Sequence, residues 1–387
     1  MGALKVFIVA GEPSGDALGG ALMRGLNTLA PGVVYAGIGG PLMQSQGLTS
    51  QFDMNELSVM GIAEVLPKYR HLKRRIKETA DAVVATKPDV LITIDSPDFS
   101  LRVAKQVKAQ SSIRTVHYVA PTVWAWRPKR AAKMAQMIDH VLALFPFEPP
   151  YMEAEGIACD FVGHPAATVP RATPAETAAF RAEHGVAEAD PLALVLPGSR
   201  RGEVSRMAPV FGEALGQISA TRPAMRMILP VAPAVAALVK AEVSDWPVAP
   251  IVLDPSGMSP EAAATRKRTA FAAADAALAT SGTVALELAA AGTPMVSAYS
   301  FHWLTLFILK RMAVTDTGSL INHVTETRVV PEVIAEKFTV PNIVAAMNTL
   351  LDDPSGQAAA MELTMDRLGR GGEDPGLRAA RAVLDRL

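Results

Sequence analysis

The chain has 387 residues, a formal net charge of −1 and a single cysteine. This length exceeds the ~250–300 residues at which one core stops growing, so two domains are expected, and near-neutral charge excludes a global field that attracts nucleic acid. Cys159 alone cannot form an intrachain disulfide, which fits a reducing compartment, and no apolar run reaches the roughly 18 residues of a membrane span. We therefore expect a cytoplasmic protein, with binding to a membrane face left open.

Apolar strand-like runs alternate with helical patterns in the first half of the chain. The predicted strands are 5–10, 33–37, 89–94, 114–119, 140–144 and 160–162, and helical patterns include 14–29, 74–86 and 98–110. This alternation is typical of a parallel sheet with crossover helices. Three prolines then fall within 164–174, and their density predicts an interdomain linker.

The same alternation restarts after the linker. Strands are predicted at 192–196, 225–230, 251–253, 276–279 and 294–298, and helices at 203–219, 260–273 and 283–291. From residue 340 onward only helical patterns follow. We expect an α/β protein with two Rossmann-like domains, 1–165 and 175–340, and a helical tail, 341–387.

The loop Ala10-Gly-Glu-Pro-Ser-Gly-Asp16 lies between the first predicted strand and helix. Ligands gather at this position because it lies at the carboxyl end of a parallel sheet. Ser14 and Gly15 open the helix, whose backbone N–H groups can face an anion or a sugar oxygen. The alternative is a tight turn with a helix cap and no ligand.

A pair of carboxylates, Asp95 and Asp98, follows the apolar run that ends at Ile94. One of them can supply a general base, and Asp98 is preferred because the start of a helix favours its ionised form. The alternative is an Asx turn with a cap. A metal site is less favoured because no histidine or cysteine cluster supports one, so no metal is expected.

An aromatic and basic loop covers residues 116–130. Trp124 and Trp126 lie beside Arg127, Lys129 and Arg130, a composition that suits stacking on a ring and pairing with phosphate. A purely structural role for the two tryptophans is an equal alternative.

Two loops of the second half are suited to an anion. Gly198, Ser199 and Arg200 follow one predicted strand, and Ser281, Gly282 and Thr283 follow another, with Glu287 one helical turn further on. The glycines let backbone N–H groups come close to a diphosphate, and the planar guanidinium of Arg200 can bind two of its oxygens. Glu287 can accept hydrogen bonds from ribose hydroxyls. The P-loop pattern and the spaced dinucleotide pattern are both absent, so neither ATP hydrolysis nor a dinucleotide cofactor is expected.

Two segments combine cations with large apolar side chains, as interfacial segments do. The first, 66–76, contributes Lys68, Tyr69, Arg70, Leu72, Lys73, Arg74 and Arg75. The second, 301–311, is more apolar and has cationic ends. The alternatives are a solvated charged face for the first segment and a core helix for the second.

These motifs together resemble the lipid-A-disaccharide synthase family. The resemblance rests on residues 10–16, Met60-Gly-Ile-Ala-Glu-Val65, residues 94–99 and 117–127, Pro146-Phe-Glu148, residues 161–165, 196–200 and 280–283, in the family's order. It implies a GT-B architecture, with two Rossmann-like domains facing a cleft and the last helices crossing back to the first domain.

The resemblance also implies a reaction and its site residues. UDP-2,3-diacylglucosamine would donate its sugar to 2,3-diacylglucosamine 1-phosphate by inverting single displacement, on the cytoplasmic face of the inner membrane. Asp98, Arg200 and Glu12 would be catalytic. The residues that would bind substrate are Ser14, Gly15, Asp95, Trp124, Trp126, Arg127, Gly198, Ser199, Ser281, Gly282, Thr283, Glu287 and Asn322. His323 departs from the family, which has an apolar residue there. The alternatives are a UDP-sugar 2-epimerase, a GT-B transferase with a soluble acceptor, and a non-catalytic binding protein.

Overall fold

A computed structural model describes residues 2–57, 62–127, 129–301, 306 and 315–387, and for residues 62–69 the backbone alone. The chain forms two compact units. Unit 1 comprises Met1–Thr168 and Leu368–Leu387, and unit 2 comprises Val169–Arg367. The change of unit at Thr168 lies inside the proline-rich segment 164–174.

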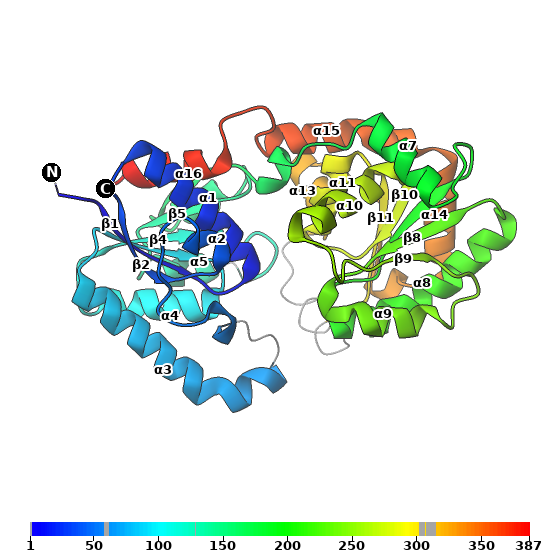
Figure 1. Ribbon diagram of the computed structural model, residues 1–387. Helices are drawn as coiled ribbons and strands as arrows, with labels where there is room; N and C mark the ends of the chain where they lie inside the picture. The colour runs from blue at the N-terminus through cyan, green and yellow to red at the C-terminus, as the bar shows by residue number, and fades with distance from the viewer. Residues whose placement is uncertain (1, 58–61, 128, 302–305, 307–314) are drawn as a thin grey trace. The chain divides into compact units, whose positions relative to one another are not determined.

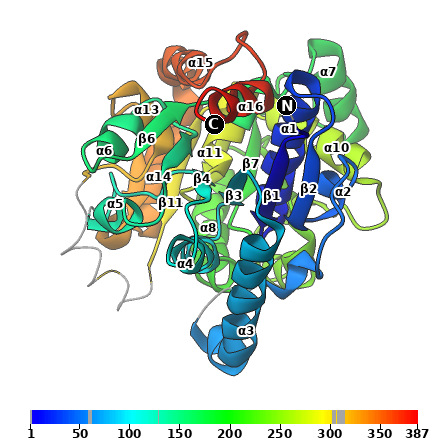
Figure 2. The same ribbon diagram turned by 90° about the vertical axis from the view of Figure 1, so that its left-hand side faces the viewer.

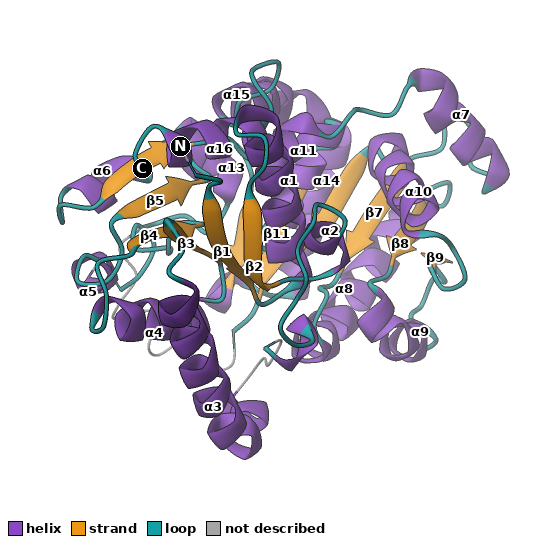
Figure 3. Ribbon diagram, turned by 60° about the vertical axis from the view of Figure 1, so that its left-hand side comes forward, coloured by secondary structure: helices purple, strands orange, loops and turns teal. Residues whose placement is uncertain are grey.

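Unit 1 is built on a six-stranded parallel sheet with the order β2-β1-β3-β4-β5-β6. Its strands are β1 (Lys5–Ala10), β2 (Val34–Ile38), β3 (Val90–Ile94), β4 (Arg114–Tyr118), β5 (His140–Ala143) and β6 (Ala158–Phe161). Its helices are α1 (Pro13–Leu29), α2 (Pro41–Gln44), α3 (Ile62–Thr86), α4 (Pro97–Lys108), α5 (Lys129–Met134), α6 (Pro149–Glu153) and α16 (Pro375–Leu384), with short 3-10 turns η1 (Met54–Glu56) and η2 (Pro165–Thr168). Figure 3 shows the helices packed around the sheet.

Unit 2 has a second six-stranded parallel sheet, of order β12-β11-β10-β7-β8-β9. Its strands are β7 (Leu192–Leu196), β8 (Arg226–Pro230), β9 (Ile251–Leu253), β10 (Ala276–Ala279), β11 (Met295–Tyr299) and β12 (Glu332–Ile334). Its helices are α7 (Pro174–Glu183), α8 (Arg201–Thr221), α9 (Ala236–Val243), α10 (Pro260–Ala273), α11 (Val284–Ala291), α13 (Leu320–Thr325), α14 (Val340–Asp352) and α15 (Ala358–Arg367), with 3-10 turns η3 (Pro233–Val235), η4 (Ala335–Lys337) and η5 (Pro354–Gln357).

The central strands are buried on both faces, which explains their unbroken apolar sequences. Every residue of β3 and of β7 is buried. Helices cover both faces of such a sheet, so no residue of these strands needs to meet water.

Both sheets contain a point where the strand order reverses. In unit 1 the chain runs from β1 to β2 on one side and then to β3 on the other side of β1. In unit 2 it runs from β7 through β8 to β9, and then returns to β10 on the other side of β7. Ligands of open α/β sheets bind beyond the carboxyl ends of the strands at such points.

The helical segment after residue 340 is divided between the units, which corrects the expected tail 341–387. Ile343, Met347 and Leu350 of α14 enter the core of unit 2, because this helix packs on α8 and β11. Only α16 crosses back to unit 1, where it lies along α1, as Figures 1 and 2 show.

Two glycines allow the close approach of α16 to α1. A Cβ on Gly376 would lie 2.5 Å from the carbonyl oxygen of Ala21, and one on Gly25 would lie 2.6 Å from the carbonyl oxygen of Gly376. No larger residue fits at either position without moving a helix.

Candidate active site

The loops after β7 and β10 line one cavity of about 660 Å³ in unit 2. These two strands flank the reversal point of the sheet, so the fold itself brings the loops together. All seven residues that the sequence predicted for nucleotide binding in this unit line the cavity. They are Gly198, Ser199 and Arg200 after β7, Ser281, Gly282 and Thr283 after β10, and Glu287 in α11.

Glu203 organises the loop after β7. Its carboxylate accepts hydrogen bonds from the backbone N–H groups of Ser199 at 3.2 Å and Arg200 at 3.3 Å, and from the Arg200 guanidinium at 3.2 Å. Gly198 has φ of +120°, and a Cβ there would lie 2.6 Å from the Cβ of Glu203. The loop therefore needs glycine at this position, and Glu203 sets the direction of Arg200.

The loop after β10 leads into α11 with two fixed contacts. The Ser281 hydroxyl donates to the carbonyl oxygen of Gly318 at 2.8 Å. Glu287, on the first turn of α11, pairs with Lys267 of α10, whose Nζ lies 2.5 Å from its carboxylate. Lys267 lies 5.3 Å from the ring centre of Phe271 and also lines the cavity. A carboxylate held in this way can present an oxygen to a ligand hydroxyl in a defined direction.

Sequence reasoning missed the rest of the cavity wall. The wall comes from the ends of β8 and β9 and from α10, and it includes Val231, Pro233, Leu253, Met258 and Lys267. Apolar and proline side chains there suit the flat face of a base. Glu203 could have been found from the sequence, because a glutamate at the third position of a helix often accepts hydrogen bonds from the backbone before it. Lys267 could not, because its helix carries no motif.

The loops after β1 and β3 meet at the reversal point of unit 1. A Cβ on Gly11 would lie 2.7 Å from the Ser96 hydroxyl oxygen and 3.4 Å from the Cβ of Leu57, so only glycine fits between these residues. Glu12 is the half-buried N-cap residue of α1, and Ser14 is exposed one residue after Pro13 opens the helix. Gly15 is buried against Ala10. The loop 10–16, which was predicted to bind a ligand, therefore lies beside the turn that carries Asp95 and leads to Asp98.

Asp16, the last residue of that loop motif, has a structural role. Its buried carboxylate accepts hydrogen bonds from the backbone N–H groups of Gly40 at 2.9 Å, Leu42 at 3.0 Å and Met43 at 3.0 Å. It thereby ties the start of α2 to α1.

Asp95 and Asp98 occupy different environments. Asp95 and Ser96 both have left-handed backbones, with φ of +48° and +43°. Neither residue is glycine, so the turn is strained in the manner common at functional sites. Burial raises the pKa of the Asp95 carboxyl group. Asp98, on the first turn of α4, is 96% exposed, and its carboxylate lies 4.0 Å from the Arg130 guanidinium.

The two tryptophans of the aromatic loop also differ. Trp124 is buried and meets the Phe147 ring edge-on at 5.2 Å. Trp126 is half-buried and donates from its indole N–H to the Thr122 hydroxyl at 3.0 Å. The guanidinium of Arg127 lies 4.0 Å above the Trp126 ring. Trp126 and Arg127 form a stacking platform, whereas Trp124 holds the loop to the body of the unit.

Glu148 is a buried carboxylate in the motif Pro146-Phe-Glu148. It accepts hydrogen bonds from the backbone N–H groups of Leu144 at 3.1 Å and Phe145 at 3.0 Å, and it contacts Trp124. Burial raises the pKa of Glu148 to about 8. No role was predicted for this motif from the sequence, and the structure shows that Glu148 supports the loop that carries Trp124.

The chain matches one protein family over nearly its whole length. Residues 6–373 match the family of lipid-A-disaccharide synthetases. The chain is 64% identical over 384 residues to the lipid-A-disaccharide synthase of Ruegeria pomeroyi, covering 99% of this chain and 96% of the relative. It is 42% identical over 387 residues to the lipid-A-disaccharide synthase of Rhodospirillum centenum, covering 99% and 94%. The chain belongs to the lipid-A-disaccharide synthase family.

This membership confirms the resemblance inferred from the motifs and makes the protein a glycosyltransferase of lipid A biosynthesis. Its fold is also similar to that of a UDP-GlcNAc 2-epimerase from Neisseria meningitidis, with a TM-score of 0.64, 12% identity and coverage of 99% of each chain. A likeness at this identity shows a shared GT-B-like fold and carries no information on the reaction.

Asn322 was also expected to bind substrate, and although it belongs to unit 2 it does not line the cavity of that unit. Asn322 is fully buried, and its amide group donates to the carbonyl oxygen of Val330 at 2.9 Å and accepts from the N–H of Val330 at 3.0 Å. It also lies 3.3 Å from Glu332. These contacts fasten α13 to the chain that enters β12, which is a structural role.

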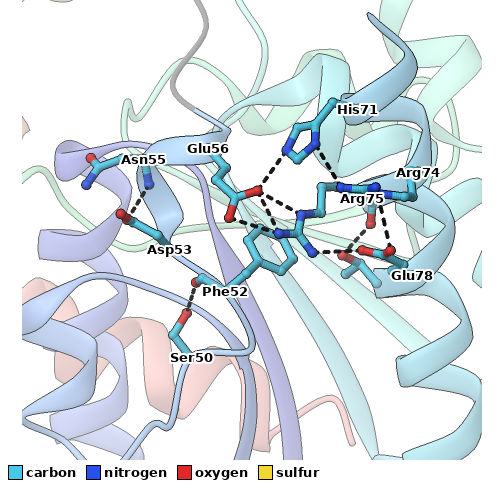
Figure 4. Close-up of polar contacts among 10 residues, drawn as sticks. Ser50, Phe52, Asp53, Asn55, Glu56, His71, Arg74, Arg75 and Glu78 are labelled. Atoms are coloured by element: carbon cyan, nitrogen blue, oxygen red, sulfur yellow. Dashed lines mark hydrogen bonds and ion pairs between the residues drawn. The ribbon is translucent and has the colours of Figure 1, made fainter. Parts of the chain in front are cut away.

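The predicted membrane-facing cations lie on α3, a long helix that projects from unit 1 (Figures 1 and 2). Arg70, Lys73 and Arg74 are exposed and Leu72 is half-buried. Arg74 pairs with Glu78 at 3.5 Å but is 62% exposed, whereas Arg75 is only 21% exposed and is bound by both Glu56 and Glu78 (Figure 4). The side chains of Lys68 and Tyr69 lie outside the described residues, as do residues 58–61 and most of the segment 301–311.

In the part of the chain that the structure describes, no helix is long and apolar enough to cross a bilayer. Within the same residues, no three His, Cys, Asp or Glu side chains are grouped so that they could hold a metal ion.

Proposed function

We propose that this synthase family member transfers the sugar of UDP-2,3-diacylglucosamine to the 6-hydroxyl of 2,3-diacylglucosamine 1-phosphate and releases UDP. The observation that carries the proposal is the unit 2 cavity, in which both anion-suited loops and Glu287 line one space. The identity of both lipid substrates rests on the family.

The donor nucleotide fits the unit 2 cavity. The diphosphate would lie between Arg200 and the start of α11, where a cation and backbone N–H groups both favour negative charge. Glu287, held by Lys267, would accept hydrogen bonds from the ribose hydroxyls. The apolar wall near Val231 and Met258 would receive the base.

The acceptor would bind at the carboxyl edge of the unit 1 sheet. Glu12, Ser14 and Gly15 would contact the sugar, while Trp126 and Arg127 would stack on a ring or pair with the 1-phosphate. Asp98 lies on the same edge, where it is accessible to an incoming hydroxyl. Asp95, three residues earlier in the strained turn, would support Asp98 or the acceptor.

The reaction is a single displacement. The acceptor oxygen attacks the anomeric carbon while its proton passes to the Asp98 carboxylate. The bond from the anomeric carbon to the UDP oxygen breaks, and UDP takes the electron pair. Arg200 and the start of α11 stabilise the charge that develops on the leaving diphosphate. Attack from the face opposite UDP converts an α-linked donor into a β-linked product.

Docking to the cytoplasmic face of the inner membrane would bring the enzyme to its lipid substrates. The exposed cations Arg70, Lys73 and Arg74 lie within about one turn of α3, and cations near an anionic surface are each worth about 1 kcal/mol. Arg75 is left out of this set because it is only 21% exposed and donates two hydrogen bonds to Glu56, whereas Arg74, which pairs with Glu78 at 3.5 Å, is 62% exposed. Among the side chains that the structure describes, we therefore assign the docking role to Arg70, Lys73 and Arg74.

Calorimetric titration with UDP tests the donor site. We expect Arg200→Ala and Glu287→Ala each to weaken binding about tenfold or more, since hydrogen bonds to charged groups contribute roughly 1.5–3 kcal/mol. Arg201→Ala is the matched control, because Arg201 is exposed and is absent from the described cavity lining. Unchanged affinity in both cavity variants would place the nucleotide elsewhere.

A further inference from the structure

A cluster of charged side chains joins α3 to the segment before it (Figure 4). The Arg75 guanidinium donates through Nε to one oxygen of Glu56 at 2.8 Å and through Nη2 to the other at 2.9 Å. It also donates to Glu78 at 2.9 Å and lies 4.2 Å above the Phe52 ring. His71 adds a contact of 2.7 Å between its Nε2 and Glu56.

This pairing is better defined than the other ion pairs of α3. The side chains of Arg75 and Glu56 are only 21% and 30% exposed, and the hydrogen bond from Arg75 lowers the pKa of Glu56. Lys77 and Asp81, which form another pair on α3, are 71% and 49% exposed. A two-pronged guanidinium–carboxylate pair fixes both distance and direction, whereas an exposed lysine pair fixes neither.

Glu56 belongs to η1, and its neighbours lead to the candidate acceptor site. Met54 is buried, and its side chain lies against Gly40. Leu57, the residue after Glu56, is buried and lies against Gly11, which in turn contacts Ser96. A continuous set of packed residues therefore runs from Arg75 on α3 through Glu56 and Leu57 to the Gly11 loop.

We propose that Glu56 and Arg75 are positioning residues that hold α3 in a fixed relation to the Gly11 loop. The helix that carries the docking cations and the loop that receives the acceptor then move as one body. That α3 docks on a membrane and that the Gly11 loop binds the acceptor both rest on the proposed function. The linkage between α3 and the loop rests only on the contacts above. Neither residue needs to touch substrate for this linkage to operate.

Hydrogen exchange read by mass spectrometry tests the linkage on the full-length protein. We expect Glu56→Gln and Arg75→Met to raise amide exchange in residues 50–57 and also in residues 11–16, by about threefold to tenfold, because local stability is lost along the packed set. The double variant should exceed the stronger single variant only slightly, because the two side chains act through each other. Asp81→Asn, which removes the exposed pair of the same helix, should leave residues 11–16 unchanged.

Two results would overturn the proposal. One is faster exchange confined to residues 50–57 and α3, with residues 11–16 at the wild-type rate. The other is an equal rise at residues 11–16 in the Asp81→Asn control. If Glu56→Gln unfolds the unit, Arg75→Lys replaces it in the experiment. Lysine keeps the positive charge but cannot donate two parallel hydrogen bonds to Glu56, so we expect amide exchange at residues 11–16 to rise by an intermediate amount.

Kinetics add a readout that a purely structural contact would not change. With acceptor embedded in anionic vesicles, we expect Glu56→Gln to lower kcat about tenfold while the affinity for UDP stays at the wild-type value, because the nucleotide lies in unit 2. Unchanged kcat alongside faster exchange at residues 11–16 would contradict the positioning role. If no variant and no wild-type protein transfers sugar, the proposed function fails, and the exchange experiment still decides the linkage.

Discussion

Asp95 and Asp98 lie three residues apart but have different exposure, which allows the two carboxylates to be separated by experiment. We expect Asp98→Asn to lower turnover about 10² to 10⁴-fold, the usual contribution of a general base, while UDP binds normally. Steady-state kinetics with both lipid substrates would measure this loss. Near-normal turnover in Asp98→Asn, together with a large loss in Asp95→Asn, would assign the proton transfer to Asp95.

Glu148 should make stability depend on pH. Burial raises its pKa from 4.5 to about 8, so between these pH values the folded protein binds a proton that the unfolded chain does not. The stability from this group is complete below about pH 4.5 and is lost as pH rises toward about 8, at no more than about 1.4 kcal/mol per pH unit.

Glu148→Gln stays neutral and still offers an oxygen to the N–H groups of Leu144 and Phe145. We therefore expect the variant to gain stability relative to wild type as pH rises from 5.5 to 8.5. Unfolding midpoints in denaturant at several pH values would show it. Parallel pH curves for the two proteins would mean that Glu148 keeps an ordinary pKa.

At the scale of elements, the exposed face of α3 should bind anionic membranes. Changing Arg70, Lys73 and Arg74 together to glutamine should weaken binding to anionic vesicles at least about tenfold, and high salt should weaken wild-type binding in the same way. A control that changes Arg24 and Lys105, exposed cations of α1 and α4, should retain binding. If neither the triple substitution nor high salt changes vesicle binding, this face of α3 contacts solvent and not the membrane.

The crossing of α16 over α1 gives a prediction about stability. Gly376→Ala would place a methyl group 2.5 Å from the Ala21 carbonyl oxygen, so we expect a loss of about 1–3 kcal/mol of unfolding free energy. Gly202→Ala is the matched control, because its nearest neighbour would lie 3.8 Å away. Thermal melts of the two variants would compare them. An unchanged melting temperature for Gly376→Ala would mean that the helices separate without cost.

At the scale of the whole molecule, strong local signals predicted the fold well. The bounds of β1, β7, β9 and β10 agree with the predicted strands, because each is an apolar run that ends at a polar or glycine-rich loop. β12 was not predicted, since three residues at a sheet edge carry too little pattern. The division of the helical tail also escaped prediction, because apolar periodicity shows that a helix packs but not on which unit.

The candidate site was predictable only where a motif marked it. The residues of the two unit 2 loops and Glu287 could be named from the sequence, and the structure brings them to one cavity. Lys267 and the apolar wall could not, because long-range packing alone places them there. Arg75 shows the converse, since the composition of segment 66–76 indicated a membrane contact, while its partner Glu56 lies 19 residues earlier in η1, where no local pattern links the two.

The central claim is that the two lipid sugars are joined with inversion as UDP leaves. Nuclear magnetic resonance of the purified protein with UDP-2,3-diacylglucosamine and 2,3-diacylglucosamine 1-phosphate tests it most directly. We predict that the α-anomeric donor signal falls while UDP and a β-linked disaccharide appear in equal amounts, and only when acceptor is present. Conversion of the donor to an isomeric UDP-sugar without use of acceptor, or an α-linked product, would contradict the claim.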